Sequence, residues 1–319
     1  MSVLMSVELS NPLTFPHLYL YKRTIEWEPM SERRKRWGDR RDAYWLRDVD
    51  GLHAIMPHLM DKRTDAEVFV NYEFDVTALM DFIEERNAEE SGNRTKFFHC
   101  IIMSVARLIQ LRPDLNIYVS GRRMYMRHKT SMAFIARRDF EDGSRESLII
   151  TEVDDDWCLR KVTDEITGSV NKVRESDSYG VDKTLDSLAR IPRPLLMVLA
   201  RIVKILDFYG KAPKSVTKGD PNFCTVLLSN LGSIGCPSIY HHLNNYGTNS
   251  IAVTIGPVHS VEVFREDGTR EIRRVVSAGI TLDERIADGM YFARSLEVLQ
   301  NILSKPELLD IPMGDKIEL

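Results

Sequence analysis

The pattern of apolar and polar positions changes its period several times in the first half of the chain. Residues 66–77 alternate apolar with polar side chains, as a half-buried strand does. Residues 78–90 repeat apolar side chains at helical spacing, and residues 96–111 predict a strongly apolar helix that ends before a proline. Two strands are predicted within residues 120–139 and a third within residues 144–156.

The second half continues this alternation of helices and strands. Residues 154–185 are highly charged with a thin apolar seam, which predicts a helix. Residues 223–232 predict a strand followed by a turn, and residues 250–264 predict another strand. Residues 265–282 form a hairpin whose turn is predicted at Asp267-Gly268. The chain is therefore expected to fold as an α/β protein.

The most apolar stretch of the chain is residues 194–209, which read PLLMVLARIVKILDFY. Arg201, Lys204 and Asp207 interrupt it, and it is too short to span a bilayer. We expect an amphipathic helix that packs against the core. The alternative is a helix that rests on a membrane surface or on a partner protein.

Composition and charge narrow the classes of function. The chain has 319 residues and a formal net charge of −4, so no global positive field indicates a nucleic-acid partner. Its four cysteines lie far apart without a C-x-x-C pair, which indicates reduced thiols in a cytoplasmic protein and no structural metal site. The N-terminal residues lack the pattern of a secretory signal, and no transmembrane segment is predicted.

A basic run, SERRKRWGDRR, occupies residues 31–41 near the N-terminus. Because Glu32 and Asp39 interleave its cations, a solvated helix face is the favoured interpretation. Contact with an acidic partner or with the phosphates of a cofactor is the alternative. We expect residues 1–43 to form an arm that packs on the main domain or on a neighbouring subunit.

Candidate chemistry concentrates in residues 281–292, which read TLDERIADGMYF. An apolar strand leads into an acidic turn, and a helix with apolar positions at three- and four-residue steps follows. Asp288 is a candidate N-cap, because its carboxylate can accept hydrogen bonds from the free amides of the first helical turn. An ordinary capped helix is the simplest interpretation of these residues taken alone.

This stretch resembles the D-H-R-x-x-D-G signature of the dihydrolipoyl acyltransferase catalytic domain, a family that includes chloramphenicol acetyltransferase. Asp283, Arg285, Asp288 and Gly289 match the signature, and Glu284 stands where the family has its catalytic histidine. The segments DVTAL and RPDLN earlier in the chain resemble the same family.

The resemblance implies the chloramphenicol acetyltransferase-like fold, a two-layer α/β domain with a mostly antiparallel sheet flanked by helices. It assigns residues 44–319 to an acyltransferase-type catalytic domain, free-standing because the chain has no room for a lipoyl domain. It also implies a homotrimer, or a multiple of trimers, with active sites between subunits.

The function implied by the resemblance is acyl transfer between CoA, or an acyl-CoA substrate, and a thiol or small hydroxyl acceptor, such as a lipoyl-type group. Ser229, in the S-x-L-G turn, corresponds to the donor that stabilises the oxyanion, and Asp288 to an aspartate that braces the loop. Asp283, Arg285 and Gly289 correspond to structural positions of the loop. No residues are assigned to cofactor binding.

Glu284 is a weaker base than the histidine that it replaces. The pKa of an ordinary glutamate is about four units below that of a thiol, so proton transfer from the thiol to the glutamate is unfavourable by nearly 6 kcal/mol. An imidazole base has a higher pKa and removes about half of this difference. Burial would raise a carboxylate pKa toward the useful range, whereas an ion pair with Arg285 would leave Glu284 without a chemical role. The alternative function is therefore a pseudoenzyme that serves as a trimeric scaffold or binding module.

His241 and His242 follow the Ser229 strand and are candidates for a relocated imidazole. Adjacent residues of a strand point in opposite directions, so one of the two is expected to face the pocket. A pair of polar loop residues is the competing interpretation. A metal is not expected, because no third ligand accompanies the pair.

Overall fold

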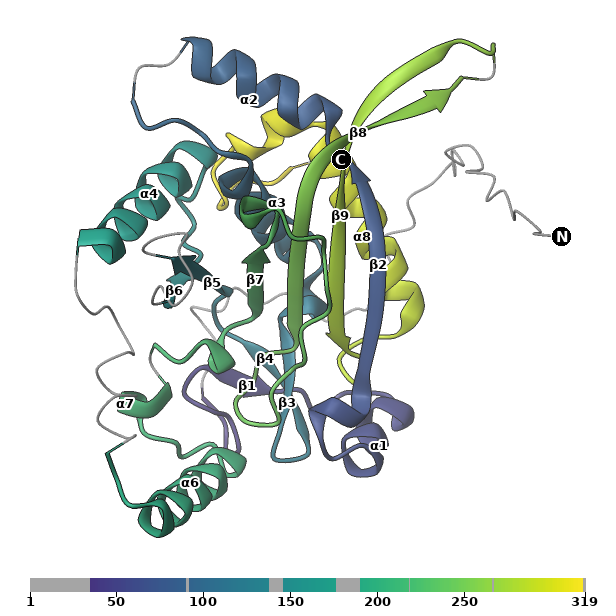
Figure 1. Ribbon diagram of the computed structural model, residues 1–319. Coiled ribbons are helices and arrows are strands. Elements are labelled where there is room, and N and C mark those ends of the chain that lie inside the picture. Colours follow the sequence, from purple (N-terminus) through teal and green to yellow (C-terminus); the bar gives the residue numbers. More distant parts are fainter. Residues whose placement is uncertain are drawn as a thin grey trace, which may run out of the picture. The chain divides into compact units, whose positions relative to one another are not determined.

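A six-stranded mixed sheet forms the centre of the molecule (Figure 1), in the strand order β2-β9-β8-β7-β5-β6. The computed structural model describes residues 35–89, 92–137, 146–175, 190–217, 219–265 and 267–317. Strand β7 is parallel to both β5 and β8, and the other three neighbouring pairs are antiparallel. The strands of this sheet are β2 (Glu67–Asp75), β5 (Ser131–Arg137), β6 (Glu146–Glu152), β7 (Val226–Asn230), β8 (Ile251–Phe264) and β9 (Arg270–Asp283).

A smaller, three-stranded antiparallel sheet has the order β1-β4-β3. Its strands are β1 (Ala43–Trp45), β3 (Ile117–Ser120) and β4 (Arg123–Arg127). The α-helices of the described residues are α1 (Gly51–Leu59), α2 (Thr77–Glu89), α3 (Phe97–Leu111), α4 (Leu159–Glu175), α6 (Arg193–Phe208), α7 (Lys214–Thr217) and α8 (Gly289–Ser304).

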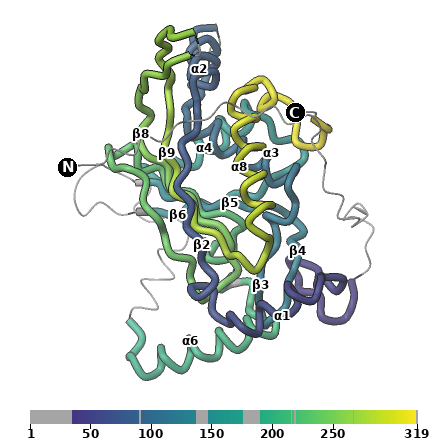
Figure 2. Tube along the Cα trace, turned by 90° about the vertical axis from the view of Figure 1, so that its right-hand side faces the viewer, coloured from purple at the N-terminus to yellow at the C-terminus, as the bar shows by residue number. Residues whose placement is uncertain are grey.

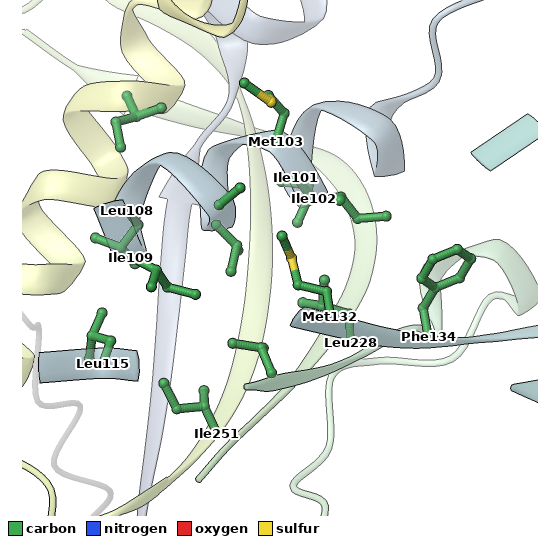
Figure 3. Packing of buried hydrophobic residues seen from close by; sticks show 14 of the residues in the cluster. Ile101, Ile102, Met103, Leu108, Ile109, Leu115, Met132, Phe134, Leu228 and Ile251 are labelled. Carbon is green, nitrogen blue, oxygen red and sulfur yellow. The ribbon is translucent and has the colours of Figure 1, made fainter. Parts of the chain in front are cut away.

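The core lies between one face of the large sheet and the helices α3 and α8, which Figure 2 shows on the same side of β2 and β9. Alternate residues of β9 from Val276 to Leu282 face these helices, because successive side chains of a strand point to opposite faces. Helix α3 is buried along most of its length. Figure 3 shows its apolar side chains above Met132, Leu228 and Ile251.

The opposite face of the sheet carries small and polar side chains. The strand register aligns Ser229 of β7 with Thr254 of β8, Gly279 of β9 and Asn71 of β2 in one row across the sheet. A loop of residues 236–247 runs over this face. The loop can lie directly on the strands because Gly279 has no side chain. A Cβ at this position would collide with the carbonyl oxygen of Ile239.

Several predictions from the sequence are confirmed. The protein has the α/β fold expected, with a sheet flanked by helices. The apolar helix ends at Leu111, just before the proline. The β8–β9 hairpin turns near Gly268, whose φ of 77° lies in the left-handed region that favours glycine. The last strand, β9, ends at Asp283, one residue beyond the predicted hairpin, and the acidic turn begins there.

The expectation that residues 194–209 pack against the core is wrong. They form helix α6 as predicted, but Asp207 is its one buried residue. Among the helices of the described residues, none combines the length and the apolar character needed to cross a bilayer. Residues 36–319 form one compact unit, so the last residues of the predicted 1–43 arm belong to it, and residues 1–34 lie outside the described residues.

Candidate active site

The acidic turn after β9 is held by a buried ion pair. Asp283 is fully buried at the end of the strand, and both of its carboxylate oxygens accept hydrogen bonds of 2.7 Å from the guanidinium of Arg285. Arg285 also donates to the carbonyl oxygen of Met60 at 2.8 Å. The guanidinium of Arg63 lies 3.5 Å from Asp283 on the other side. The turn is therefore fixed from within the protein.

Arg63 connects the turn to the loop over the sheet. It donates to the carbonyl oxygens of Asn244 (2.5 Å) and Gly247 (3.1 Å) from its two terminal nitrogens. Burial lowers the pKa of Arg63 to about 10, although the neighbouring Asp283 raises it, so the guanidinium stays protonated at neutral pH. The buried cation therefore ties the loop to the acidic turn.

Glu284 and Asp288 have different surroundings in the same turn. The backbone N–H of Glu284 donates to the carbonyl oxygen of Ala66 at 2.9 Å, and its side chain is partly exposed. Asp288 is exposed and accepts a hydrogen bond of 2.7 Å from the N–H of Tyr291, which confirms it as the N-cap of α8. Gly289 is the first residue of that helix.

Ser229 lies far from the acidic turn within one protomer. It is buried on β7, in the row that contains Thr254 and Gly279, whereas Asp283 lies four residues further along β9. Strand geometry places the two residues roughly 13 Å apart along the strands and roughly 10 Å apart across them, or about 16 Å in total. A single chain therefore does not bring Ser229 and Glu284 to one reacting atom.

One of the two candidate histidines does lie beside the acidic turn. The Nδ1 atom of His242 lies 3.1 Å from a carboxylate oxygen of Glu67, and the other oxygen accepts from the N–H of Leu243 at 2.5 Å. The Glu67 side chain is 4% exposed, whereas that of His242 is 83% exposed. Glu67 pairs directly with Asp283 across β2 and β9. His242 is thus oriented by a buried carboxylate next to the turn.

Sequence reasoning missed Glu67 and Arg63. Neither belongs to a motif, and each reaches the site through strand pairing or a contact with a loop nearly 180 positions away in the sequence. The alternation of β2 does place Glu67 on the same face as Phe69, whose ring packs edge-on against Tyr240 of the loop and is near His242. The alternation along β2 was therefore the sequence pattern that could have indicated Glu67. His241 is partly exposed.

A polar cavity of about 260 Å³ adjoins the acidic turn. Its cationic side chains are those of Arg63, Arg122, Lys204 and Arg285, and its carboxylates are Asp61 and Asp207. The buried Nε atom of Arg63 lies 3.5 Å from Asp283 and makes no hydrogen bond within the described residues. In the part of the chain that the structure describes, no three His, Cys, Asp or Glu side chains come together to hold a metal ion. The cavity therefore suits a polar, anionic group.

Comparison with known proteins gives the fold and a partial sequence match. Residues 211–311 match the model of the family described as 2-oxoacid dehydrogenases acyltransferase (catalytic domain). This range contains Ser229, the loop with His242, and the acidic turn. No curated protein matches the chain.

Three solved structures are similar over most of their length. A probable dihydrolipoamide acetyltransferase from Listeria monocytogenes 4b F2365 has a TM-score of 0.55 at 15% identity, over 82% of this chain and 94% of that one. The dihydrolipoamide acetyltransferase of Azotobacter vinelandii has a TM-score of 0.55 at 14% identity, over 83% and 94%. A chloramphenicol acetyltransferase has a TM-score of 0.51 at 13% identity, over 82% and 99%.

At such identities the likeness to these structures concerns the fold, and the family model adds likeness in sequence. The chain therefore has the fold that chloramphenicol acetyltransferase and these dihydrolipoamide acetyltransferases share, and its residues 211–311 are similar to the catalytic domain of the 2-oxoacid dehydrogenase acyltransferases.

Proposed function

We propose that this protein transfers an acyl group between CoA and a thiol or small hydroxyl acceptor, with His242 as the general base. The observation that carries the proposal is the contact of His242 with the buried carboxylate of Glu67, beside the turn where the related signature has its histidine. A carboxylate at Nδ1 fixes the imidazole and leaves Nε2 to take the proton of the acceptor.

An imidazole suits this step better than the carboxylate of Glu284. The ordinary imidazole pKa is about two units above that of a glutamate, which recovers about 3 kcal/mol of the unfavourable proton transfer from a thiol. The Glu284 side chain is partly exposed, and its backbone N–H donates to Ala66.

The distance between Ser229 and the turn favours a site shared between subunits. An oxyanion donor must lie within about 3 Å of the oxygen that becomes charged, and the base must reach the attacking group of the same substrate. Since one protomer separates Ser229 from Asp283 by about 16 Å, the proposal requires the serine of a neighbouring subunit. A homotrimer, as the family resemblance implies, would supply it.

The Azotobacter vinelandii enzyme offers a parallel for the spacing in the turn. Its catalytic mechanism has been investigated at a serine, a histidine and, four positions after the histidine, an asparagine. In this chain Glu284 and Asp288 have the same spacing, and Ser229 precedes them by a similar interval. Under this proposal the spacing is kept while both side chains of the turn differ, with Glu284 in place of a histidine and Asp288 in place of an asparagine, and the imidazole is supplied from elsewhere.

An acyl-CoA substrate also needs cations for its phosphates. The cavity beside the turn offers the exposed side chain of Arg122, and the buried guanidinium of Arg63 adds positive charge behind it. The guanidinium of Arg122 would donate hydrogen bonds to phosphate oxygens, and the charge of Arg63 would favour the anion nearby. No residue is proposed to hold a metal.

The second candidate function is a trimeric scaffold or binding module without turnover. Glu284 at the position of the signature histidine is the observation that favours it. Under this alternative His242 would stabilise the loop through Glu67 and would have no role in chemistry.

Kinetics distinguish the two functions. Purified protein is mixed with acetyl-CoA and dihydrolipoamide, and released CoA is quantified by chromatography. We expect His242→Ala to lower kcat by about 10²–10⁴-fold, with partial recovery when imidazole is added to the buffer. Glu67→Gln should lower kcat less, because it retains an acceptor for Leu243 but not the charge that orients the ring.

Two matched variants complete the experiment. His259→Ala removes another exposed imidazole on the same sheet and should leave the rate unchanged. Glu284→Gln should have little effect. A rate lost in Glu284→Gln and retained in His242→Ala would assign the base to Glu284 instead. No CoA release by the unaltered protein with any thiol or hydroxyl acceptor tested would exclude the enzyme and leave the scaffold.

A further inference from the structure

Helix α6 exposes a wide apolar surface. At 100° per residue its apolar side chains occupy more than half of the helix circumference, and those facing solvent are 37% to 70% exposed. This apolar face of α6 consists of Leu195, Val198, Leu199, Ile202, Ile205 and Tyr209. A face of this kind is normally covered by another apolar surface.

The solvent-facing charges of α6 and the residues that flank it are positive. Residues 190–217 contain six Lys and Arg side chains and a single acidic one, Asp207. Asp207 is buried and bonded at 2.7 Å to the guanidinium of Arg40, so it does not offset the exposed cations. Because the whole chain has a net charge of −4, this segment is a basic region on an acidic protein.

A second apolar helix lies at the same end of the compact unit. Figures 1 and 2 both place α1 and α6 at the lower end, and the cavity beside the acidic turn is lined by residues of both helices. Leu52, Ile55 and Leu59 of α1 are more than half exposed, as is Trp37 nearby in the chain. The two helices together present apolar side chains over one end of the fold.

We propose that this end of the protein binds the surface of an anionic phospholipid bilayer, with α6 lying in the plane of the interface. An exposed apolar face combined with Lys and Arg on the remaining side is the pattern of helices that lie at such an interface. The helix is about 24 Å long, so it would rest among the headgroups and would not cross the membrane.

Charge disfavours a two-fold contact with a second copy of this chain as the covering surface. In a two-fold symmetric contact each α6 would meet the same segment of its partner, and the cations of both would come together. Anionic lipid headgroups accept those cations and also offer acyl chains to the apolar face. The bilayer therefore matches both properties of the helix.

Cosedimentation with vesicles tests the proposal on the full chain. One set of vesicles contains phosphatidylcholine alone, and the other contains an added fraction of phosphatidylglycerol. We expect the protein to sediment with the anionic vesicles, and less so as salt is raised. Neutralising two cations in Arg193→Gln plus Arg201→Gln should weaken the partition about 25-fold, because each cation near an anionic surface contributes roughly a factor of five.

A matched pair of variants isolates the apolar face. Ile202→Asp plus Ile205→Asp should abolish sedimentation, whereas Phe264→Asp plus Ile272→Asp, which alters more exposed apolar residues on the β8–β9 hairpin, should retain it. Because all four side chains are exposed, their replacement should leave the fold intact, and circular dichroism verifies this. A charged-residue variant that no longer folds would be replaced by Ile202→Ser plus Ile205→Ser.

Three results would overturn the proposal. One is no sedimentation with anionic vesicles. Another is equal sedimentation of the α6 and hairpin variants. The third is a change in oligomeric state, measured by light scattering, in the α6 variant alone without a change in vesicle binding, which would assign the face to a protein contact.

Discussion

The buried pair of Asp283 and Arg285 predicts a large loss of stability when the carboxylate is neutralised without a change in size. In Asp283→Asn the guanidinium groups of Arg285 and Arg63 both remain buried, with exposed fractions of 2% and 4%, and lose the carboxylate with which both are paired. Removing one partner of a buried ion pair costs about 3–5 kcal/mol. For a compact unit of this size the expected decrease in Tm is about 6–10 °C.

Urea denaturation followed by circular dichroism measures the loss. The control is Glu271→Gln, which removes a carboxylate from the exposed pair with Arg265 on the hairpin and should leave the midpoint almost unchanged. The double variant Asp283→Asn plus Arg285→Gln should be less destabilised than the sum of its single variants. If Asp283→Asn unfolds at the same urea concentration as the unaltered protein, the ion pair does not hold the turn.

Three further changes follow from buried groups. Burial lowers the pKa of His99 to about 4, so the unfolded chain binds a proton at this imidazole more tightly than the folded protein does. The free energy of unfolding should therefore fall as the pH drops from about 6.5 toward 4, by about 2–3 kcal/mol between pH 7 and 4.5. Urea titrations of His99→Gln should lack this decrease. Gly279→Ala should destabilise the protein by about 1–3 kcal/mol, since its Cβ would collide with the loop, whereas Gly168→Ala on open α4 should stabilise it by about 0.5–1 kcal/mol; thermal melts compare the two. Burial raises the pKa of both Cys100 and Cys224 to about 12, so iodoacetamide at neutral pH should label the other two cysteines only, as mass spectrometry of the native protein would show.

Local patterns predicted the elements well where one residue period decides the structure. The alternation in β2, the length of α3 and the Asp-Gly turn of the β8–β9 hairpin each depend on near neighbours in the sequence. Helix α6 shows the limit of such patterns. Its apolar repeat predicts a helix with one apolar side, but the repeat does not say what covers that side.

The candidate site was only partly accessible from the sequence. The acidic turn and the N-cap role of Asp288 follow from a continuous stretch of residues, so the prediction for Asp288 was confirmed. The choice between His241 and His242 depends on Glu67, which the register of β2 against β9 places beside the turn. Such a contact follows from strand pairing across the whole domain and leaves no local trace.

The loop that lies on Gly256 and Gly279 has a consequence for how this protein can change during evolution. Its path is set by close backbone contacts with two residues that lack side chains, and by the hydrogen bond from Thr254 to the carbonyl oxygen of Ile239. Arg63 and Glu67 also hold the loop through its backbone, because Arg63 donates to the carbonyl oxygens of Asn244 and Gly247 and Glu67 accepts from the N–H of Leu243. Exposed side chains of the loop that point outward, such as that of His242, take no part in these backbone contacts. Mutations at these outward positions can therefore accumulate while the course of the backbone is preserved, so new reactive groups can arise on the loop without loss of the fold.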